Sequence, residues 1–142
     1  MFDEKNSDPN LRGQYNYMNV KSWSKKVHGK DIFNMKYIFV PIHKDGNHWT
    51  LAVIDMEKKC IQYYDSCAGD KNAAKLGSKI MDSLLAYVAD EYKYKGSKGG
   101  QEMNVSKWEL INCSTTASPQ QTNGYDCGLF LCMTCKFIFH FE

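Results

Sequence analysis

HWTLAVIDMEKKCIQYYDS, residues 48–66, is the stretch of sequence that decides the fold. Residues 48–56 and 60–66 are rich in β-branched and aromatic residues, and they predict two strands. The charged residues 57–59 between them predict a tight turn. Two strands joined in this way form an antiparallel hairpin.

A further β-rich run lies immediately upstream of this hairpin. MKYIFVPIH, residues 35–43, predicts another strand, and Lys44-Asp45-Gly46-Asn47 has the residues of a tight hairpin turn. Three short strands joined by tight turns predict an antiparallel meander.

The hydrophobic period changes downstream of the meander. Apolar residues recur at threes and fours from Lys71 to Tyr94, which predicts an amphipathic helix. After a glycine-rich break at 96–101, residues 107–114 return to alternation and predict a fourth strand. A polar loop at 116–124 follows, and the apolar run from Tyr125 onward predicts a buried helix. The predicted class is therefore α+β.

Length and composition describe one ordinary globular domain spanning residues 1–142, in which we expect the polar residues 1–20 to be irregular. Hydrophobic residues make up 43% and charged residues 24%, far from the disordered class. The net charge of +2 gives no electrostatic case for nucleic acid or an anionic membrane. The apolar runs are too short to span a bilayer, and the acidic start is no secretory signal. We expect a monomer without a nucleic-acid or membrane partner.

The cysteines indicate a reducing compartment, the nucleus or the cytoplasm. Six of them, at positions 60, 67, 113, 127, 132 and 135, are scattered through core-like segments, unlike the disulfide framework of a secreted domain. Cys132 and Cys135 have the CxxC spacing of zinc ligands, but a second ligand pair is missing. We therefore expect no metal site.

Residues 119–128, PQQTNGYDCG, concentrate the chemistry. Asn123 and Gly124 predict a tight turn, and Asp126 can cap the helix that follows. Cys127 then lies in the first helical turn, where the helix dipole favours a thiolate. Gly128 allows a close approach of substrate to the backbone. We expect Asn123, Gly124 and Gly128 to lie in the substrate-binding region.

Gln121, six positions before Cys127, can direct an amide N–H toward the same point. Together with the backbone N–H of Cys127 it would form an oxyanion hole with two donors. Gln120 lies beside it, and loop glutamines are common.

A nucleophilic thiolate needs a base, and the base needs a partner that orients it. His48 opens one predicted strand, and Asp65 lies near the end of the next. The turn at 57–59 brings both positions to the same edge of the sheet. If this edge also receives the helix that begins near Cys127, the three residues form a Cys–His–Asp site.

These motifs resemble a known family. HWTLAVID, IQYYDS and PQQTNGYDCGLFLC are similar, in this order, to the motifs of the Ulp-type SUMO (sentrin-specific) cysteine proteases. The segment Trp23–Val27 resembles their W-[ST]-K-x-V motif, and the similarity runs from about Tyr15 to Phe139.

The resemblance implies an α+β, papain-like fold, in which a small mixed sheet packs against the nucleophile-bearing helix, and it implies a role for each site residue. Cys127 would be the nucleophile, His48 the base, Asp65 its orienting partner and Gln121 the oxyanion donor. Trp49 would form one wall of a narrow tunnel that admits only a Gly-Gly tail.

By this resemblance the chain would cleave after the C-terminal Gly-Gly of a SUMO-like modifier, either in conjugates or in the precursor. Its partners would be that modifier and its conjugates, and no metal or organic cofactor would be needed. Catalytic domains of the family extend further at both ends, so we expect the modifier-binding platform to be cropped.

Two other functions stay open on the sequence. Related triads also serve proteases of other ubiquitin-like modifiers and acyltransferases. A chain without the flanking segments could also be a non-catalytic module that binds the modifier.

Overall fold

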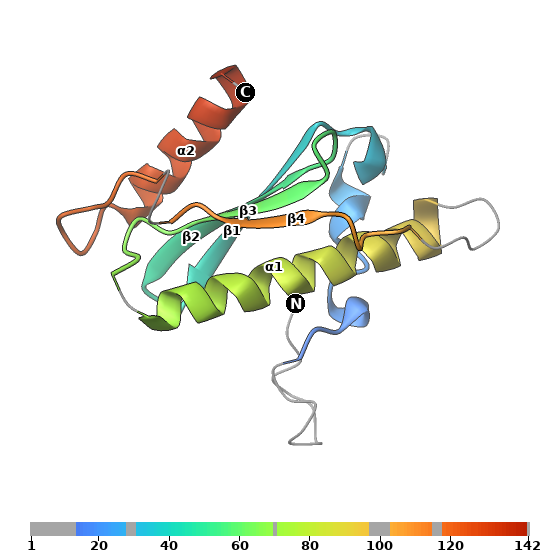
Figure 1. The fold of residues 1–142 in the computed structure, drawn as a ribbon, viewed down its shortest axis with the longest axis horizontal. Coiled ribbons are helices and arrows are strands. Elements are labelled where there is room, and N and C mark those ends of the chain that lie inside the picture. The colour runs from blue at the N-terminus through green and yellow to red at the C-terminus, as the bar shows by residue number, and fades with distance from the viewer. Residues whose placement is uncertain (1–13, 28–30, 70, 97–102, 115–117, 142) are drawn as a thin grey trace. The chain divides into compact units, whose positions relative to one another are not determined.

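A computed structural model describes residues 14–27, 31–69, 71–96, 103–114 and 118–141 of the chain (Figure 1). Its backbone contacts divide the chain into two units, Met1–Met35 with Ser83–Lys107 and Lys36–Asp82 with Trp108–Glu142. All the predicted site residues belong to the second unit. The single domain expected from the sequence stays a prediction.

The second unit is built on a four-stranded sheet, as the sequence predicts. The strands are β1 (Tyr37–Lys44), β2 (His48–Asp55), β3 (Cys60–Tyr64) and β4 (Glu109–Asn112), and they lie in that order. The first three are antiparallel, whereas β4 runs parallel to β3. The sheet is therefore mixed.

The turn between β1 and β2 fixes their register. Asp45 and Gly46 both have positive φ, 51° and 74°, and Asn47 N donates to Lys44 O at 3.1 Å. Two successive positive φ angles are typical of a type I′ turn, whose twist matches that of a hairpin. Asp and Gly tolerate this conformation better than other residues, which explains their place in the sequence.

The turn between β2 and β3 is held by a buried carboxylate. Asp55 is 1% exposed, and its Oδ1 accepts from the backbone N–H groups of Glu57 and Lys58 at 3.0 and 2.8 Å. Lys59 completes the turn with a φ of 55°. This turn sets a register in which Leu51 lies opposite Tyr64.

The two faces of the sheet contact different helices. Tyr64, Leu51 and Val53 form a buried cluster with Ile138 of helix α2 (Cys127–Phe141). Neighbouring residues of a strand point to opposite faces, and Tyr63 meets Gly77 of helix α1 (Lys71–Glu91) on the other side. A Cβ at position 77 would lie 2.6 Å from the Tyr63 ring, so glycine is required for this close packing.

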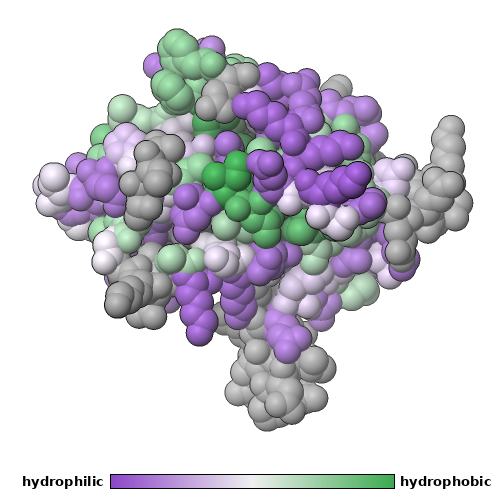
Figure 2. Space-filling view, viewed as in Figure 1, coloured by the Kyte–Doolittle hydropathy of each residue, from purple (hydrophilic) through white to green (hydrophobic). Residues whose placement is uncertain are grey.

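The prediction that the C-terminal helix is buried is wrong. Among the described residues of α2 only Cys127 and Ile138 are buried. Apolar side chains at four-residue intervals face outward, namely Leu129, Met133, Phe137 and Phe141, with exposed fractions of 57%, 61%, 57% and 76%. Figure 2 shows apolar side chains gathered at the surface of this part of the molecule. The helix is apolar nearly all round, but a helix on a sheet buries only one stripe.

The first unit consists of short helices and the second half of α1. Its 3-10 helices are η1 (Tyr17–Asn19), η2 (Trp23–Lys26) and η4 (Ile32–Asn34). The sequence predicts that residues 1–20 are irregular. Residues 1–13 lie outside the described residues, and helix η1 lies in the remaining part of that segment.

Helix α1 ends close to its predicted boundary. The sequence predicts a helix to Tyr94, whereas the α-helix ends at Glu91 and a π-helical turn continues through Tyr92–Gly96. The glycine-rich break at 96–101 falls almost entirely outside the described residues. No helix in the described parts of the chain is long and apolar enough to cross a membrane.

Candidate active site

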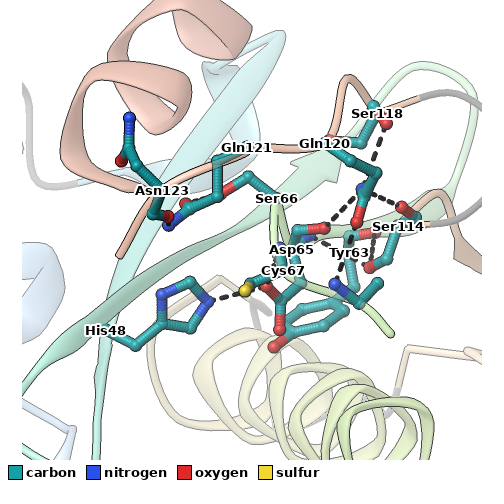
Figure 3. Close-up of polar contacts among 11 residues, drawn as sticks. His48, Tyr63, Asp65, Ser66, Cys67, Ser114, Ser118, Gln120, Gln121 and Asn123 are labelled. Carbon is teal, nitrogen blue, oxygen red and sulfur yellow. Dashed lines mark hydrogen bonds and ion pairs between the residues drawn. The ribbon is translucent and has the colours of Figure 1, made fainter. Parts of the chain in front are cut away.

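His48 and Asp65 meet at the edge of the sheet where β2 begins and β3 ends. His48 Nε2 lies 2.7 Å from Asp65 Oδ1, and Figure 3 marks this contact with a dashed line. The Asp65 side chain is completely buried, and the His48 side chain is 17% exposed. The register of β2 and β3 produces this contact, as the spacing of the two residues predicts.

The Asp65 carboxylate is held by its own loop. Its Oδ1 also accepts from Cys67 N at 2.8 Å, and Asp65 N donates to Ser114 Oγ at 3.0 Å. The buried Oδ2 has no hydrogen-bond partner among the described residues. The carboxylate is therefore fixed with Oδ1 toward the imidazole. Because Nε2 is engaged there, Nδ1 is the ring nitrogen left for a second partner.

Cys127 is the first residue of α2 and is 5% exposed. The preceding Asp126 accepts from Phe130 N through its backbone carbonyl at 3.0 Å, which starts the helix. Its carboxylate accepts from Asn123 Nδ2 at 2.7 Å. Unpaired N–H groups at a helix start carry partial positive charge, and the first turn of α2 places Cys127 beside them.

The start of α2 and the start of β2 border the same small cleft. Cys127, Trp49 and Ser66 are among the residues that line it. A Cβ at Gly128 would lie 3.9 Å from Trp49 Cδ1, so this tryptophan borders the first turn of the helix. Trp49 is 40% exposed and stacks on His43, with ring centroids 4.4 Å apart. Trp49 directly follows His48, so the strand that carries the imidazole also borders the cysteine.

The two adjacent glutamines have different surroundings. Gln120 uses its carboxamide on the backbone: Nε2 donates to Ser114 O at 2.6 Å, and Oε1 accepts from Ala68 N at 3.0 Å. Gln121 instead reaches Ser66 in the cleft, whose Oγ donates to Gln121 Oε1 at 2.7 Å. Gln120 contacts the cleft through the backbone carbonyl of Ser118 at 3.2 Å, whereas Gln121 contacts it through the side-chain hydroxyl of Ser66.

The loop before Cys127 carries two further predicted residues. Asn123 Oδ1 accepts from the backbone N–H groups of Tyr125 and Asp126, and Asn123 O accepts from Gln121 Nε2 at 2.6 Å. Gly124 is exposed, with no atom within 4 Å of a Cβ built there. Asn123 thus connects Gln121 to the start of α2, while contact of Asn123, Gly124 or Gly128 with substrate stays a prediction.

Two supporting residues were missed in the sequence. Ser66 follows Asp65 directly, and Ser114 follows β4; both are buried. The only signal was a hydroxyl beside an expected catalytic residue, and serines are too common in turns for that signal to be specific.

Other ionisable groups near the sheet are shifted by burial. Burial raises the pKa of the Cys60 thiol to about 11, and it also raises the pKa of Cys135. These two thiols are thus poor nucleophiles at neutral pH. Within the described residues no group of three His, Cys, Asp or Glu side chains could hold a metal ion.

Comparison with known proteins gives the chain its relatives. The profile of the "Ulp1 protease family, C-terminal catalytic domain" matches residues 2–141. Human sentrin-specific protease 2 is 39% identical over 122 residues, and ubiquitin-like-specific protease 1 of Saccharomyces cerevisiae is 35% identical over 117 residues. A solved structure of the C-terminal Ulp1 protease domain in complex with Smt3, the yeast ortholog of SUMO, is 35% identical and superimposes with a TM-score of 0.68.

The matches cover most of this chain but only part of each relative. The aligned region is 86% of this chain and 18% of the human protein, and 82% of this chain and 17% of the yeast protein. It is 85% of this chain and 48% of the solved Ulp1 domain. The chain thus spans about half of that domain.

Proposed function

Since the chain belongs to the Ulp1 protease family, we propose that it is a cysteine protease that cleaves after the C-terminal Gly-Gly of a SUMO-like modifier. The observation that carries this proposal is the 2.7 Å contact of His48 with a fully buried Asp65. It lies at the sheet edge where Trp49 borders Cys127 at the start of α2.

Acylation begins with Cys127 and His48. Asp65 holds Nε2 of the imidazole and stabilises its positive charge, so Nδ1 takes the proton of the Cys127 thiol. The thiolate then attacks the carbonyl carbon of the terminal glycine. His48 has the proton that the departing amine needs.

The negative oxygen of the tetrahedral intermediate needs donors. The backbone N–H of Cys127 is one, and Nε2 of Gln121 is the other. Collapse of the intermediate breaks the C–N bond, and the imidazolium protonates the amine. Water, deprotonated by His48, then hydrolyses the thioester and releases the modifier.

The cleft supports a substrate without side chains at its end. Trp49 lies across from Gly128, where an added Cβ would already be in van der Waals contact with the indole. A Gly-Gly tail needs no room beyond its backbone. The leaving amine is a lysine side chain in conjugates or a peptide in the precursor, and the partner is the modifier with its conjugates.

The state of the cysteines supports a reducing compartment, the nucleus or the cytoplasm. All six cysteines are free thiols in the structure. Cysteines of small secreted domains are usually paired in disulfides, so free thiols fit a reducing compartment better.

The proposal is tested with a SUMO-type modifier that carries a C-terminal electrophile such as a vinyl sulfone. We expect a covalent adduct by mass spectrometry, its loss in Cys127→Ala, and no adduct with a matched ubiquitin probe. Cys67→Ala, which removes an exposed thiol, is the matched control and should keep the adduct.

Two results contradict the proposal. A folded chain that binds the modifier without forming an adduct is a binding module. An adduct that persists in Cys127→Ala places the reactive thiol elsewhere.

A further inference from the structure

Asp65 and Ser66, which directly follow β3, contact two different residues of the site, His48 and Gln121. Resting on the function proposed above, we propose that Ser66 is a positioning residue that aims the carboxamide of Gln121 at the oxyanion. Asp65 would orient the base, and its neighbour Ser66 would orient the oxyanion donor.

The contacts of Ser66 carry this inference. Ser66 is buried, with an exposed fraction of 5%, and its Oγ donates to Gln121 Oε1 at 2.7 Å. The backbones are joined as well, because Gln121 N donates to Ser66 O at 2.8 Å. Figure 3 shows the Gln121 side chain between Ser66 and Asn123.

These contacts select one orientation of the amide group. The hydroxyl of Ser66 meets Oε1, and the carbonyl of Asn123 accepts from Nε2 at 2.6 Å. A flip of the carboxamide would place Oε1 against the carbonyl oxygen of Asn123, which is unfavourable, whereas the Ser66 hydroxyl could still accept from Nε2. One hydrogen of Nε2 is used by Asn123, and the second is left for another acceptor.

Ser66 connects Gln121 to the cleft that Cys127 lines. Ser66 and Cys127 line the same cleft, so the amide held by Ser66 is anchored at the wall beside the nucleophile. A glutamine side chain has several freely rotating bonds, and an oxyanion donor is effective only when it is already oriented. Fixing Oε1 removes most of this freedom before the substrate binds.

Ser66→Ala isolates this interaction. The substitution removes one hydroxyl, and the backbone bond from Gln121 N to Ser66 O remains. We expect the rate of hydrolysis of a modifier with a C-terminal fluorogenic amide to fall roughly tenfold, the effect of one orienting hydrogen bond. Alkylation of Cys127 by iodoacetamide, followed by peptide mass spectrometry, needs no oxyanion hole and should keep the parent rate.

A double-mutant cycle separates positioning from other roles. If Ser66 acts through Gln121, then Ser66→Ala with Gln121→Ala is no slower than Gln121→Ala alone. Ser114→Ala is the matched control, since this buried hydroxyl supports the backbone of Asp65. Its effect should multiply with that of Gln121→Ala.

The outcomes distinguish this inference from the proposed function. A parent chain that does not hydrolyse the substrate refutes the function, and the inference with it. Hydrolysis by the parent with an equal rate in Ser66→Ala overturns the inference alone. So do multiplicative effects of Ser66→Ala and Gln121→Ala, which would mean that Ser66 does not act through Gln121. Equal losses of hydrolysis and alkylation in Ser66→Ala would also overturn it, because they indicate damage to the nucleophile or its base.

An independent signature is the side-chain amide of Gln121 in a ¹⁵N–¹H spectrum. We expect a well-ordered amide in the parent chain and a more mobile one in Ser66→Ala. Equal mobility in both proteins would contradict the inference.

Discussion

Asp65→Asn tests the contact on which the proposed mechanism depends. The substitution keeps the shape of the side chain and an oxygen that accepts from His48 Nε2, but it removes the negative charge. With Nε2 and Oδ1 2.7 Å apart, the two charge centres are separated by about 4 Å. At an effective dielectric constant of about 20, that interaction contributes about 4 kcal/mol.

Two features of the structure reduce this figure. The amide dipole of asparagine still accepts a hydrogen bond, and the His48 side chain keeps 17% exposure to water. About 2–3 kcal/mol then remains, which corresponds to a fall of roughly 30- to 150-fold in the rate of acylation. The assay is the second-order rate constant of the modifier electrophile with Cys127, corrected for the folded fraction.

Asp55→Asn is the matched control. Asp55 is equally buried, its Oδ1 also accepts two hydrogen bonds, and its Oδ2 likewise lacks a partner among the described residues. It holds the turn at the other end of β2, so we expect lower stability and an acylation rate within about twofold of the parent. Equal rates in Asp65→Asn and the parent would refute the reasoning, as would equal losses in both variants.

Three further results are expected. Gln121→Ala should lower substrate hydrolysis by about 10²–10³-fold, whereas Gln120→Ala should mainly lower the denaturation midpoint, because Gln120 joins the backbone at Ala68 to the backbone at Ser114. Gly77→Ala should lower the free energy of unfolding by about 1–3 kcal/mol, because the added Cβ meets the buried Tyr63 ring at 2.6 Å; thermal denaturation measures this loss. Burial raises the pKa of Tyr63 to about 12, so its contribution to stability is present below pH about 10 and is lost as pH rises toward 12. Denaturation across that range should show a weaker pH dependence in Tyr63→Phe.

Local sequence determines the part of the fold that carries the base. The hairpin turn at Asp45-Gly46 and the alternation of β2 and β3 could be recognised directly, because turn residues and strand period are local properties. The meeting of His48 and Asp65 then follows from the register. For the same reason β4 was recognised as a strand, but its parallel pairing with β3 depends on the long connection through α1.

Properties that depend on contacts distant in the sequence could not be read in this way. The apolar residues of α2 do not reveal that Leu129 and Phe137 are exposed, because composition cannot say which side meets the sheet. Gln120 and Gln121 are chemically identical, and their environments differ through partners such as Ser114 and Ser66, which the sequence does not place. The role of Ser66 itself required the three-dimensional structure.

The order of the site residues along the chain bears on biosynthesis. His48 and Asp65 belong to one hairpin, whose contacts are close in sequence and can form early. Cys127 lies sixty-two positions after Asp65 (127 − 65 = 62) and is synthesised later. A nascent chain on the ribosome can thus pair its histidine and aspartate while the nucleophile is still absent. The site proposed above would then be completed only when α2 docks on the sheet, after the base and its partner are already in place.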